Sequence, residues 1–300
     1  MQILRFNDDR VGVIKGGNAV VDISDLISHR EIRGPQGVMD ELIGKFDSYR
    51  GAIETLLAAE TGVPLSSVKL LAPLARPSRV LAAFVNYLDR PDRTPESLPM
   101  EFFHKAPELV GPEGTILLPN IAPVLEFHAE AELAFVIGKH CKNVLAAEAM
   151  DRVFGYLPFF DVSARGMTRR SQLLPKGQDT FAPAGPFITT KDGIRDPHDL
   201  TVKSWVNGEA RQDYNTKHMA HKIPAQIAWL SRFIQLQPGD VVATGTYHVG
   251  LGPVNVGDTI EIEISGCGRA RFSFKGDSPR KAVGFQPGQQ GPRAAPISQV

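Results

Sequence analysis

Short apolar segments separated by glycine and proline turns dominate the chain from Val80 onward. Segments of this length, rich in valine, isoleucine and phenylalanine, are typical of β-strands. Helical patterns are fewer: one covers residues 145–153, and another covers 223–233, with Pro224 near its start. This pattern predicts a mixed α+β fold, β-dominated and mainly antiparallel, and not a doubly wound α/β sheet. The strands expected in this part are 80–87, 115–119, 131–138, 201–208, 240–245 and 259–268.

The first part of the chain has a different pattern and predicts a small N-terminal domain over residues 1–72. Its apolar residues indicate three short strands followed by one helix, and a segment with two prolines then leads into the next domain. We expect the main domain to cover residues 73–277. The remaining residues, 278–300, have almost no large apolar side chains and predict a flexible tail. The N-terminal elements expected are strands 1–6, 11–16 and 19–24 and a helix over 38–60.

Two glutamates, Glu130 and Glu132, lie one residue apart at the start of the apolar run EAELAFVIG. Residues i and i+2 of a strand point to the same face, so these carboxylates would lie side by side. Such a pair is most often the solvent-exposed face of an edge strand. The apolar run that follows is too long for a half-exposed strand, however, and indicates burial on both faces.

A third acid, Asp161, follows two phenylalanines in FFDVSAR and also predicts a buried carboxylate. A buried carboxylate is costly unless it is paired, protonated or bound to a metal. Three carboxylates from two strands would form an oxygen-rich site of the kind that Mg²⁺ or Mn²⁺ favours. Both explanations of the glutamate pair, exposed edge and metal site, agree with the spacing alone.

Composition narrows the possible partners. Lysine plus arginine equals aspartate plus glutamate, at 33 each, so no basic excess indicates nucleic-acid binding. No apolar stretch is long enough to span a membrane, and the first residues do not resemble a secretion signal. The two cysteines, Cys141 and Cys267, have no metal or redox spacing and are expected to be free thiols. These features favour a cytoplasmic protein that binds neither nucleic acid nor membrane.

Seven motifs in order along the chain resemble those of the fumarylacetoacetate hydrolase family, from about Arg76 to Phe272. The segment 130–138 is similar to the family's E-x-E metal strand, and DVSAR to its aspartate motif. The others include the family's lysine loop and its T-G-T turn. The seven pieces are FVNY (84–87), FFHKAPELVGPEGTILLP (102–119), EAELAFVIG (130–138), DVSAR (161–165), KGQDTFAPAGP (176–186), VNGEARQDYNTKHM (206–219) and LQPGDVVATGT (236–246).

The resemblance implies a β-roll-like barrel with a smaller N-terminal domain, usually a homodimer. It implies Mg²⁺, or Mn²⁺ or Ca²⁺, held by Glu130, Glu132 and Asp161. Typical members act on small keto acids and hydrolyse a carbon–carbon bond in 1,3-diketo acids such as acylpyruvates. A divalent ion would act there as a Lewis acid that polarises the carbonyl group.

Further residues match family positions with a role in binding or catalysis. Lys176 matches a lysine that donates to substrate or transition-state oxygens, and Thr246 matches a residue that binds the substrate carboxylate. Tyr87 follows as a substrate-binding candidate from the asparagine–tyrosine entry motif. Arg165 and Asp179 are expected to support the site, although a purely structural salt bridge would explain either one.

The chain departs from the family where hydrolytic members have a histidine and a glutamate that activate water. Those positions are Arg90 and Arg93 here. An arginine stays protonated and cannot be the base, but it can clamp a carboxylate. The candidates for a substitute base are Asp89, Asp92, His104 and His248. His128 would also point to the strand face that carries the two glutamates, so it could face the site.

We therefore expect a metal-dependent C–C bond hydrolase of an acylpyruvate-like substrate, with Lys176, His248 and Arg90 as catalytic candidates. The alternative is a lyase, a decarboxylase of an oxaloacetate-like acid, or an isomerase, because loss of the usual base pair removes the water-activating group. A non-enzymatic member of the family is a third alternative. The loop 88–101, with its three prolines, is the candidate specificity lid.

Overall fold

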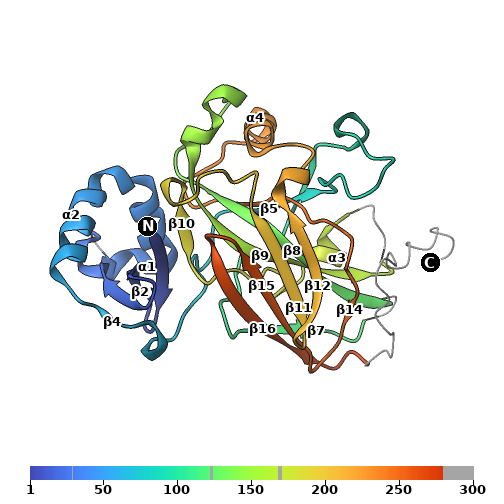
Figure 1. Ribbon diagram of the computed structural model, residues 1–300, viewed down its shortest axis with the longest axis horizontal. Helices are drawn as coiled ribbons and strands as arrows, with labels where there is room; N and C mark the ends of the chain where they lie inside the picture. Colours follow the sequence, from blue (N-terminus) through green and yellow to red (C-terminus); the bar gives the residue numbers. More distant parts are fainter. Residues whose placement is uncertain (29, 122–123, 168–170, 280–300) are drawn as a thin grey trace.

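The computed structural model describes residues 1–28, 30–121, 124–167 and 171–279, and in these residues it has two sheets (Figure 1). The larger sheet has eleven strands, in the order β4-β3-β2-β1-β10-β9-β8-β13-β5-β6, with β14 paired to β8. The smaller has five, in the order β12-β11-β15-β16-β7. Most pairs are antiparallel; β13 with β5 and β16 with β7 are parallel. The predicted β-dominated, mainly antiparallel fold is confirmed.

The strands of the larger sheet are β1 (Gln2–Phe6), β2 (Arg10–Lys15), β3 (Ala19–Asp22), β4 (Val63–Pro64), β5 (Val80–Phe84), β6 (Glu101–His104), β8 (Glu126–Ile137), β9 (Val153–Arg165), β10 (Ile188–Thr190), β13 (Val241–Ala243) and β14 (Pro253–Val254). Those of the smaller are β7 (Thr115–Leu118), β11 (Thr201–Val206), β12 (Glu209–Asn215), β15 (Thr259–Ile264) and β16 (Gly268–Gly276). The helices are α1 (Arg30–Gly44), α2 (Phe46–Ala59), α3 (Leu173–Lys176) and α4 (Ile223–Phe233). Short 3₁₀ helices are η1 (Ser24–Leu26), η2 (Leu65–Ser67), η3 (Pro95–Ser97), η4 (Ala146–Arg152), η5 (Lys191–Gly193) and η6 (Thr216–His218).

Strands β8 and β9 form the centre of the molecule and are buried along nearly their whole length. One face of β8, with Leu133 and Phe135, packs in the core shared with the smaller sheet. The opposite face, with Ala134 and Val136, packs in the core shared with the N-terminal segment. Burial on both faces is why these strands are apolar at both parities, as their sequence predicts.

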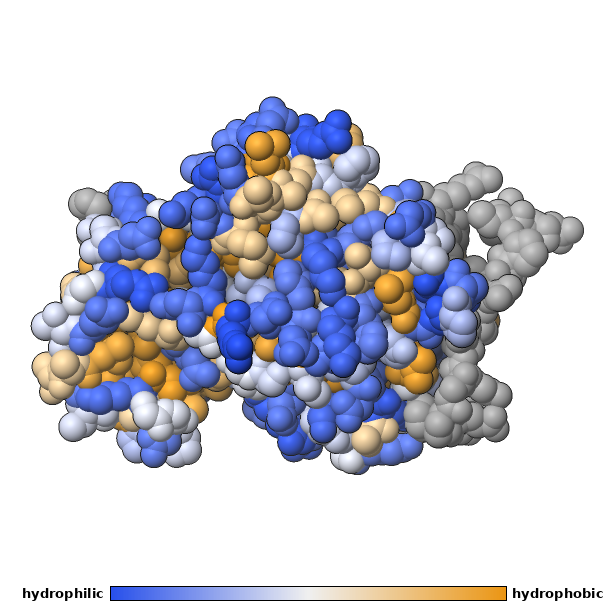
Figure 2. Space-filling view, turned by 45° about the horizontal axis from the view of Figure 1, so that its top comes forward, coloured by the Kyte–Doolittle hydropathy of each residue, from blue (hydrophilic) through white to orange (hydrophobic). Residues whose placement is uncertain are grey.

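The N-terminal segment lies at one end of the molecule, shown in blue in Figure 1, and joins the main body through its sheet. Strand β1 pairs with β10, so the larger sheet runs continuously from residues 1–72 into the rest of the chain. In the view of Figure 2, the middle of the main body is largely hydrophilic. Apolar surface gathers on the N-terminal segment, at the lower left. No described helix is long and apolar enough to cross a membrane.

Two expected helices differ from the structure. The single helix expected over 38–60 is two helices, α1 and α2, because Lys45 has left the helical conformation. The break turns α2 so that Phe46 is buried against Phe154, with ring centroids 5.1 Å apart. The helix expected over 145–153 is the 3₁₀ helix η4, and Val153 already belongs to β9. The tail expected beyond residue 278 lies almost wholly outside the described residues.

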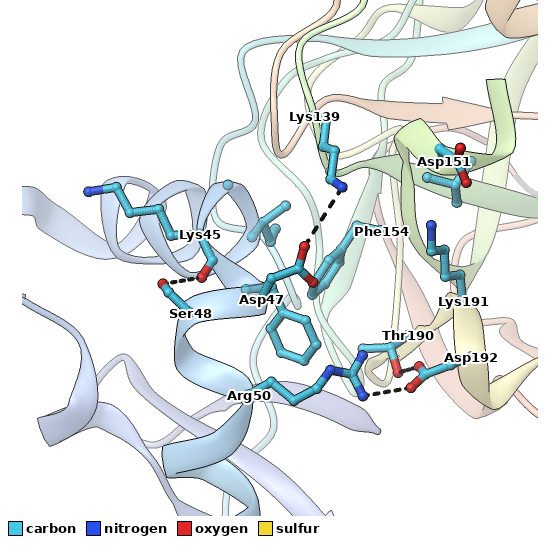
Figure 3. Close-up of a pocket in the computed structure, with 15 residues that line it drawn as sticks. Lys45, Asp47, Ser48, Arg50, Lys139, Asp151, Phe154, Thr190, Lys191 and Asp192 are labelled. Carbon is cyan, nitrogen blue, oxygen red and sulfur yellow. Dashed lines mark hydrogen bonds and ion pairs between the residues drawn. The ribbon is translucent and has the colours of Figure 1, made fainter. Parts of the chain in front are cut away.

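A cavity of about 380 Å³ separates the start of α2 from the main body (Figure 3). Charged side chains pair across it: Arg50 of α2 lies 2.8 Å from the carboxylate of Asp192, and Lys139 lies 3.7 Å from that of Asp47. Most of these side chains are exposed, so their pairs are screened by water. The apolar contact between Phe46 and Phe154 is therefore the stronger link between the two parts.

We expect Phe46→Ala to lower the free energy of unfolding by about 3–5 kcal/mol, because it removes a buried ring from a packed contact. Arg50→Met should cost less than about 1 kcal/mol, since it removes only an exposed ion pair. Urea unfolding of both variants measures the difference. An equal or larger loss in Arg50→Met would show that the ion pairs hold the two parts together.

Candidate metal centre and active site

The pairing of β8 with β9 brings the three predicted carboxylates together. Glu130 lies directly opposite Asp161 in the register of the two strands, and Glu132 follows two residues later on the same face. One carboxylate oxygen from each residue lies within 4.8 Å of those of the other two. All three side chains are buried. The exposed-edge explanation of the glutamate pair is therefore wrong for this chain, because β8 is a central strand.

Three cationic side chains surround the carboxylates. Lys176 Nζ lies 2.9 Å from Glu130 Oε2 and 2.5 Å from Asp161 Oδ2. Lys105 Nζ donates to Asp161 Oδ1 at 2.6 Å and to the Val162 carbonyl at 2.9 Å. Arg165 donates to the other oxygen of Glu130. The carboxylates are thus buried among cations that offset the cost of removing them from water.

Lys105 has no role among the residues expected from the sequence, although it is the lysine of the segment 102–119. Its side chain is completely buried, and its short contact with Asp161 places it beside the carboxylate cluster. The one signal in the sequence was a lysine directly after the apolar pair Phe102–Phe103. A lysine at a buried strand end needs a carboxylate partner, but only the fold shows which carboxylate is near.

The three acids differ in how readily they lose a proton. Burial would raise the pKa of Glu130, but Lys176 and Arg165 outweigh burial and hold that pKa well below its usual range. Burial, together with the charges of Asp161 and Glu130, raises the pKa of Glu132 well above its usual value. Glu132 accepts a hydrogen bond from the Gly245 N–H at 2.8 Å. A further cation next to Glu132 would relieve the repulsion that raises its pKa.

The donor set fits a hard divalent cation. Three carboxylates supply oxygen ligands only, which suits Mg²⁺, Mn²⁺ or Ca²⁺ better than softer metals. The ammonium group of Lys176 bridges two of the carboxylates and shows that a positive charge is stabilised at this point. Glu130, Glu132 and Asp161 would hold the ion, and Arg165 would orient Glu130.

The loop after β13 lies alongside the carboxylates and holds the predicted residue Thr246. The Thr246 hydroxyl donates to the Ala131 carbonyl at 2.7 Å and accepts from Gln212 at 2.8 Å. Its hydroxyl therefore already has two hydrogen-bond partners. Its backbone N–H donates to no acceptor in the described part of the chain. Gly245 has a φ of +89°, and a Cβ there would lie 3.0 Å from Asn86, so the close approach requires glycine.

His248 and Asp89 lie together at the end of the same loop. The His248 backbone N–H and ring Nδ1 lie 2.9 Å and 2.7 Å from Asp89 Oδ2. Arg93 donates to the other oxygen of Asp89 and to the Tyr87 carbonyl. Burial would raise the pKa of Asp89, but the hydrogen bonds from His248 outweigh it and lower that pKa. His248 is also close enough to lower the pKa of Glu130.

The other predicted residues lie in different surroundings. Tyr87 is fully buried, with its ring packed edge-on against those of Tyr214 and Tyr247. Arg90 is half-buried and pairs with Asp92 at 3.5 Å. Asp179 is exposed, and among the described residues its side chain has no hydrogen bond or ion pair. The structure therefore gives Asp179 no contact through which it would support the site.

Two of the histidines proposed as a base form no hydrogen bond with the carboxylate cluster. His104 is exposed on β6, whereas its neighbour Phe103 has its ring 5.0 Å from Lys176 Nζ. His128 is buried, with its two ring nitrogens facing Glu126 at 2.6 Å and Arg165 at 3.4 Å. His128 therefore supports Arg165, which in turn contacts Glu130.

Comparison with known proteins identifies the family. The family model described as the fumarylacetoacetate (FAA) hydrolase C-terminal domain matches residues 78–275. The chain belongs to this family. It is 42% identical over 217 residues to the mitochondrial oxaloacetate tautomerase of Xenopus laevis, a match that covers 68% of this chain and 67% of that protein.

Solved structures of the same family share the fold. Maleylpyruvate hydrolase from Sphingobium sp. SYK-6, in complex with manganese(II) and pyruvate, matches with a TM-score of 0.82 and 38% identity, over 92% of this chain and 99% of that one. The 2-hydroxyhepta-2,4-diene-1,7-dioate isomerase of Mycobacterium marinum matches with a TM-score of 0.63 and 37% identity, over 73% and 85%. The resemblance inferred from the seven motifs and the fold it implied are both confirmed.

We expect Glu130→Gln and Glu132→Gln each to weaken Mn²⁺ binding by more than about 100-fold, because each removes a charged ligand and not merely a supporting contact. Asp179→Asn is the matched control, since it removes an exposed carboxylate that does not touch the cluster. Titration calorimetry with Mn²⁺ measures the three affinities. A Glu130→Gln variant that binds Mn²⁺ as tightly as the control would contradict the assignment.

Proposed function

We propose that this protein is a divalent-metal-dependent hydrolase that cleaves a carbon–carbon bond in a 1,3-diketo acid of the acylpyruvate type. The observation that carries the proposal is its similarity to the maleylpyruvate hydrolase, which extends over 92% of this chain and includes the N-terminal segment. That protein was solved with manganese and pyruvate, and hydrolysis of an acylpyruvate releases pyruvate. The carboxylate cluster supports the same chemistry, and we propose Mg²⁺, or Mn²⁺ or Ca²⁺, as its ion.

The residues around the cluster have distinct parts in this proposal. The bound ion would polarise the keto-acid oxygens and stabilise negative charge that develops on them. Lys176 would donate to a substrate oxygen, since its ammonium group lies beside two ligand residues. The backbone N–H of Thr246 would bind the substrate carboxylate, because its hydroxyl already donates to Ala131. Both donors are rigidly placed, as stabilisation of developing charge requires.

Residues from the loop 88–101 would complete the substrate site beside the carboxylate cluster. Arg90 lies in this loop with 35% of its side chain exposed, so it would bind a second carboxylate at the far end of the substrate. The Tyr87 ring, fully buried against Tyr214 and Tyr247, would support the wall of the substrate site from behind. The expected homodimer and cytoplasmic location remain predictions.

A second candidate reaction is the interconversion of the enol and keto forms of a keto acid, as the name oxaloacetate tautomerase describes. Relatives of that name are up to 42% identical to this chain. Decarboxylation of an oxaloacetate-like acid, or another lyase reaction, is grouped with this candidate, because none of these reactions needs an activated water. The arginines at positions 90 and 93 favour these alternatives, since they replace the usual water-activating pair.

The candidates differ in the fate of solvent oxygen. With acylpyruvates and Mn²⁺ in H₂¹⁸O, we expect one ¹⁸O atom in the released carboxylic acid and complete loss of turnover in EDTA, restored by Mn²⁺. Mass spectrometry of the acid and lactate-dehydrogenase detection of pyruvate measure the two products. Oxaloacetate is tested in parallel, by its enol absorbance and by CO₂ release. Fast enol–keto conversion or CO₂ release, without acylpyruvate cleavage, would replace the hydrolase by the second candidate.

A further inference from the structure

We propose that Asp89 and His248 form a dyad that activates the attacking water, with His248 as the base and Asp89 as its positioning residue. This inference rests on the proposed hydrolase function. It supplies the group that the segment 86–93 lacks, where arginines stand at the usual histidine and glutamate positions. The base would thus come from the loop after β13 instead of the loop after β5.

The hydrogen bonds of the pair define the form of the histidine ring. Asp89 Oδ2 accepts from the His248 backbone N–H at 2.9 Å and faces ring Nδ1 at 2.7 Å. An ionised carboxylate can only accept, so Nδ1 carries the proton in the neutral ring. Nε2 is then left with its lone pair, as a general base requires. Two bonds to one oxygen also hold the ring in a single orientation.

Arg93 supports this arrangement from the other side. It donates to Asp89 Oδ1 and to the Tyr87 carbonyl, so both carboxylate oxygens of Asp89 have a partner. The Asp89 side chain is 1% exposed, and a carboxylate this deeply buried needs such partners to stay ionised. The arginine that stands at the position of the usual glutamate has therefore become the support of a different carboxylate.

The dyad lies beside the carboxylate cluster. The loop that carries His248 is held against β8 by the Gly245 N–H on Glu132 and by Thr246 on the Ala131 carbonyl. His248 is close enough to Glu130 to lower its pKa. The His248 side chain is 28% exposed, whereas Asp89 is almost inaccessible. Water can therefore reach the histidine but not the aspartate.

The other described histidines are engaged or distant. His128 has both ring nitrogens occupied, and His221 has Nε2 on the Leu98 carbonyl at 3.0 Å. His198 accepts from the Ile223 N–H and lies beside Asp196. The exposed histidines of the described chain form no hydrogen bond or ion pair with the cluster or with Asp89; they are His104, His140 and His218.

The proposed step conserves atoms and charge. His248 Nε2 takes one proton from water while the water oxygen bonds to the acyl carbonyl carbon. The carbon–carbon bond to the keto-acid portion then breaks, the acyl carbon becomes the released carboxylic acid, and the electron pair remains on the keto acid as its enolate. The proton on Nε2 passes to the enolate carbon, which gives the keto acid and restores the neutral ring.

The tautomer provides a test that needs no activity. In ¹H–¹⁵N spectra of ¹⁵N-histidine-labelled protein, assigned through His248→Gln, we expect the neutral ring of His248 to carry its proton on Nδ1. In Asp89→Asn this single preference should be lost. A proton on Nε2 in the unmodified protein would overturn the dyad, whatever reaction the protein catalyses.

Kinetics provide the second test. We expect His248→Gln to lower kcat by about 10²–10⁴-fold, with KM changed only slightly, because the base acts in the transition state. Imidazole should restore part of kcat in His248→Ala but not in Asp89→Asn, where the ring remains and only its orientation is lost. His140→Gln, an exposed histidine far from the site, is the matched control. Mn²⁺ affinity, measured for each variant, reports whether the centre is still folded.

The outcomes separate the two proposals. A His248→Gln variant that hydrolyses acylpyruvates within about threefold of the unmodified protein overturns the dyad and leaves the hydrolase intact; the same holds if imidazole fails to rescue a His248→Ala variant that binds Mn²⁺ normally. An unmodified protein that hydrolyses no acylpyruvate overturns the proposed function, and the tautomer then decides the dyad geometry alone.

Discussion

The cost of burying three carboxylates in one place governs the structure of this protein. Glu130, Glu132 and Asp161 lie on adjacent central strands, where neither water nor an exposed edge can stabilise their charge. Lys105 and Lys176 contact Asp161, and Arg165 contacts Glu130. Asp161 and Glu130 are therefore both paired with cations. Glu132 has the weakest support, since burial and its acidic neighbours raise its pKa. The arrangement favours a further cation, which is the physical basis of a metal centre.

The same strands explain why the centre lies where it does. On one face of β8, Ala134 and Val136 are covered by the N-terminal segment. Further toward the start of the strand, the same face carries Glu132 and Glu130. The polar site therefore begins where the apolar core ends, along a single row of side chains. A stable strand pair thereby holds the ligands with little freedom, and loops supply the residues that differ between members of a family.

The relatives catalyse hydrolysis, isomerisation and tautomerisation on what is structurally one scaffold. The two candidate reactions of this chain, acylpyruvate hydrolysis and enol–keto conversion, would both pass through a stabilised enolate, and only hydrolysis needs an activated water. In this chain the usual activating pair is replaced by arginines, yet Arg93 and Asp89 position a histidine from another loop. A change in the position of one base would thus keep hydrolysis within reach without altering the carboxylate cluster.

The β-dominated fold, the buried central strands and the family could be predicted from the sequence, because periodicity and seven ordered motifs are local properties of the chain. It also marked Glu130, Glu132 and Asp161, since buried acids are rare enough to need a reason. It could not show that Lys105 contacts Asp161, that Asp179 is exposed, or that residues 38–60 form two helices. Nor could it show that Asp89 and His248 are in contact, because they are 159 residues apart. These contacts depend on strand register and loop packing, which bring together side chains whose separation along the chain carries no information about their distance in space.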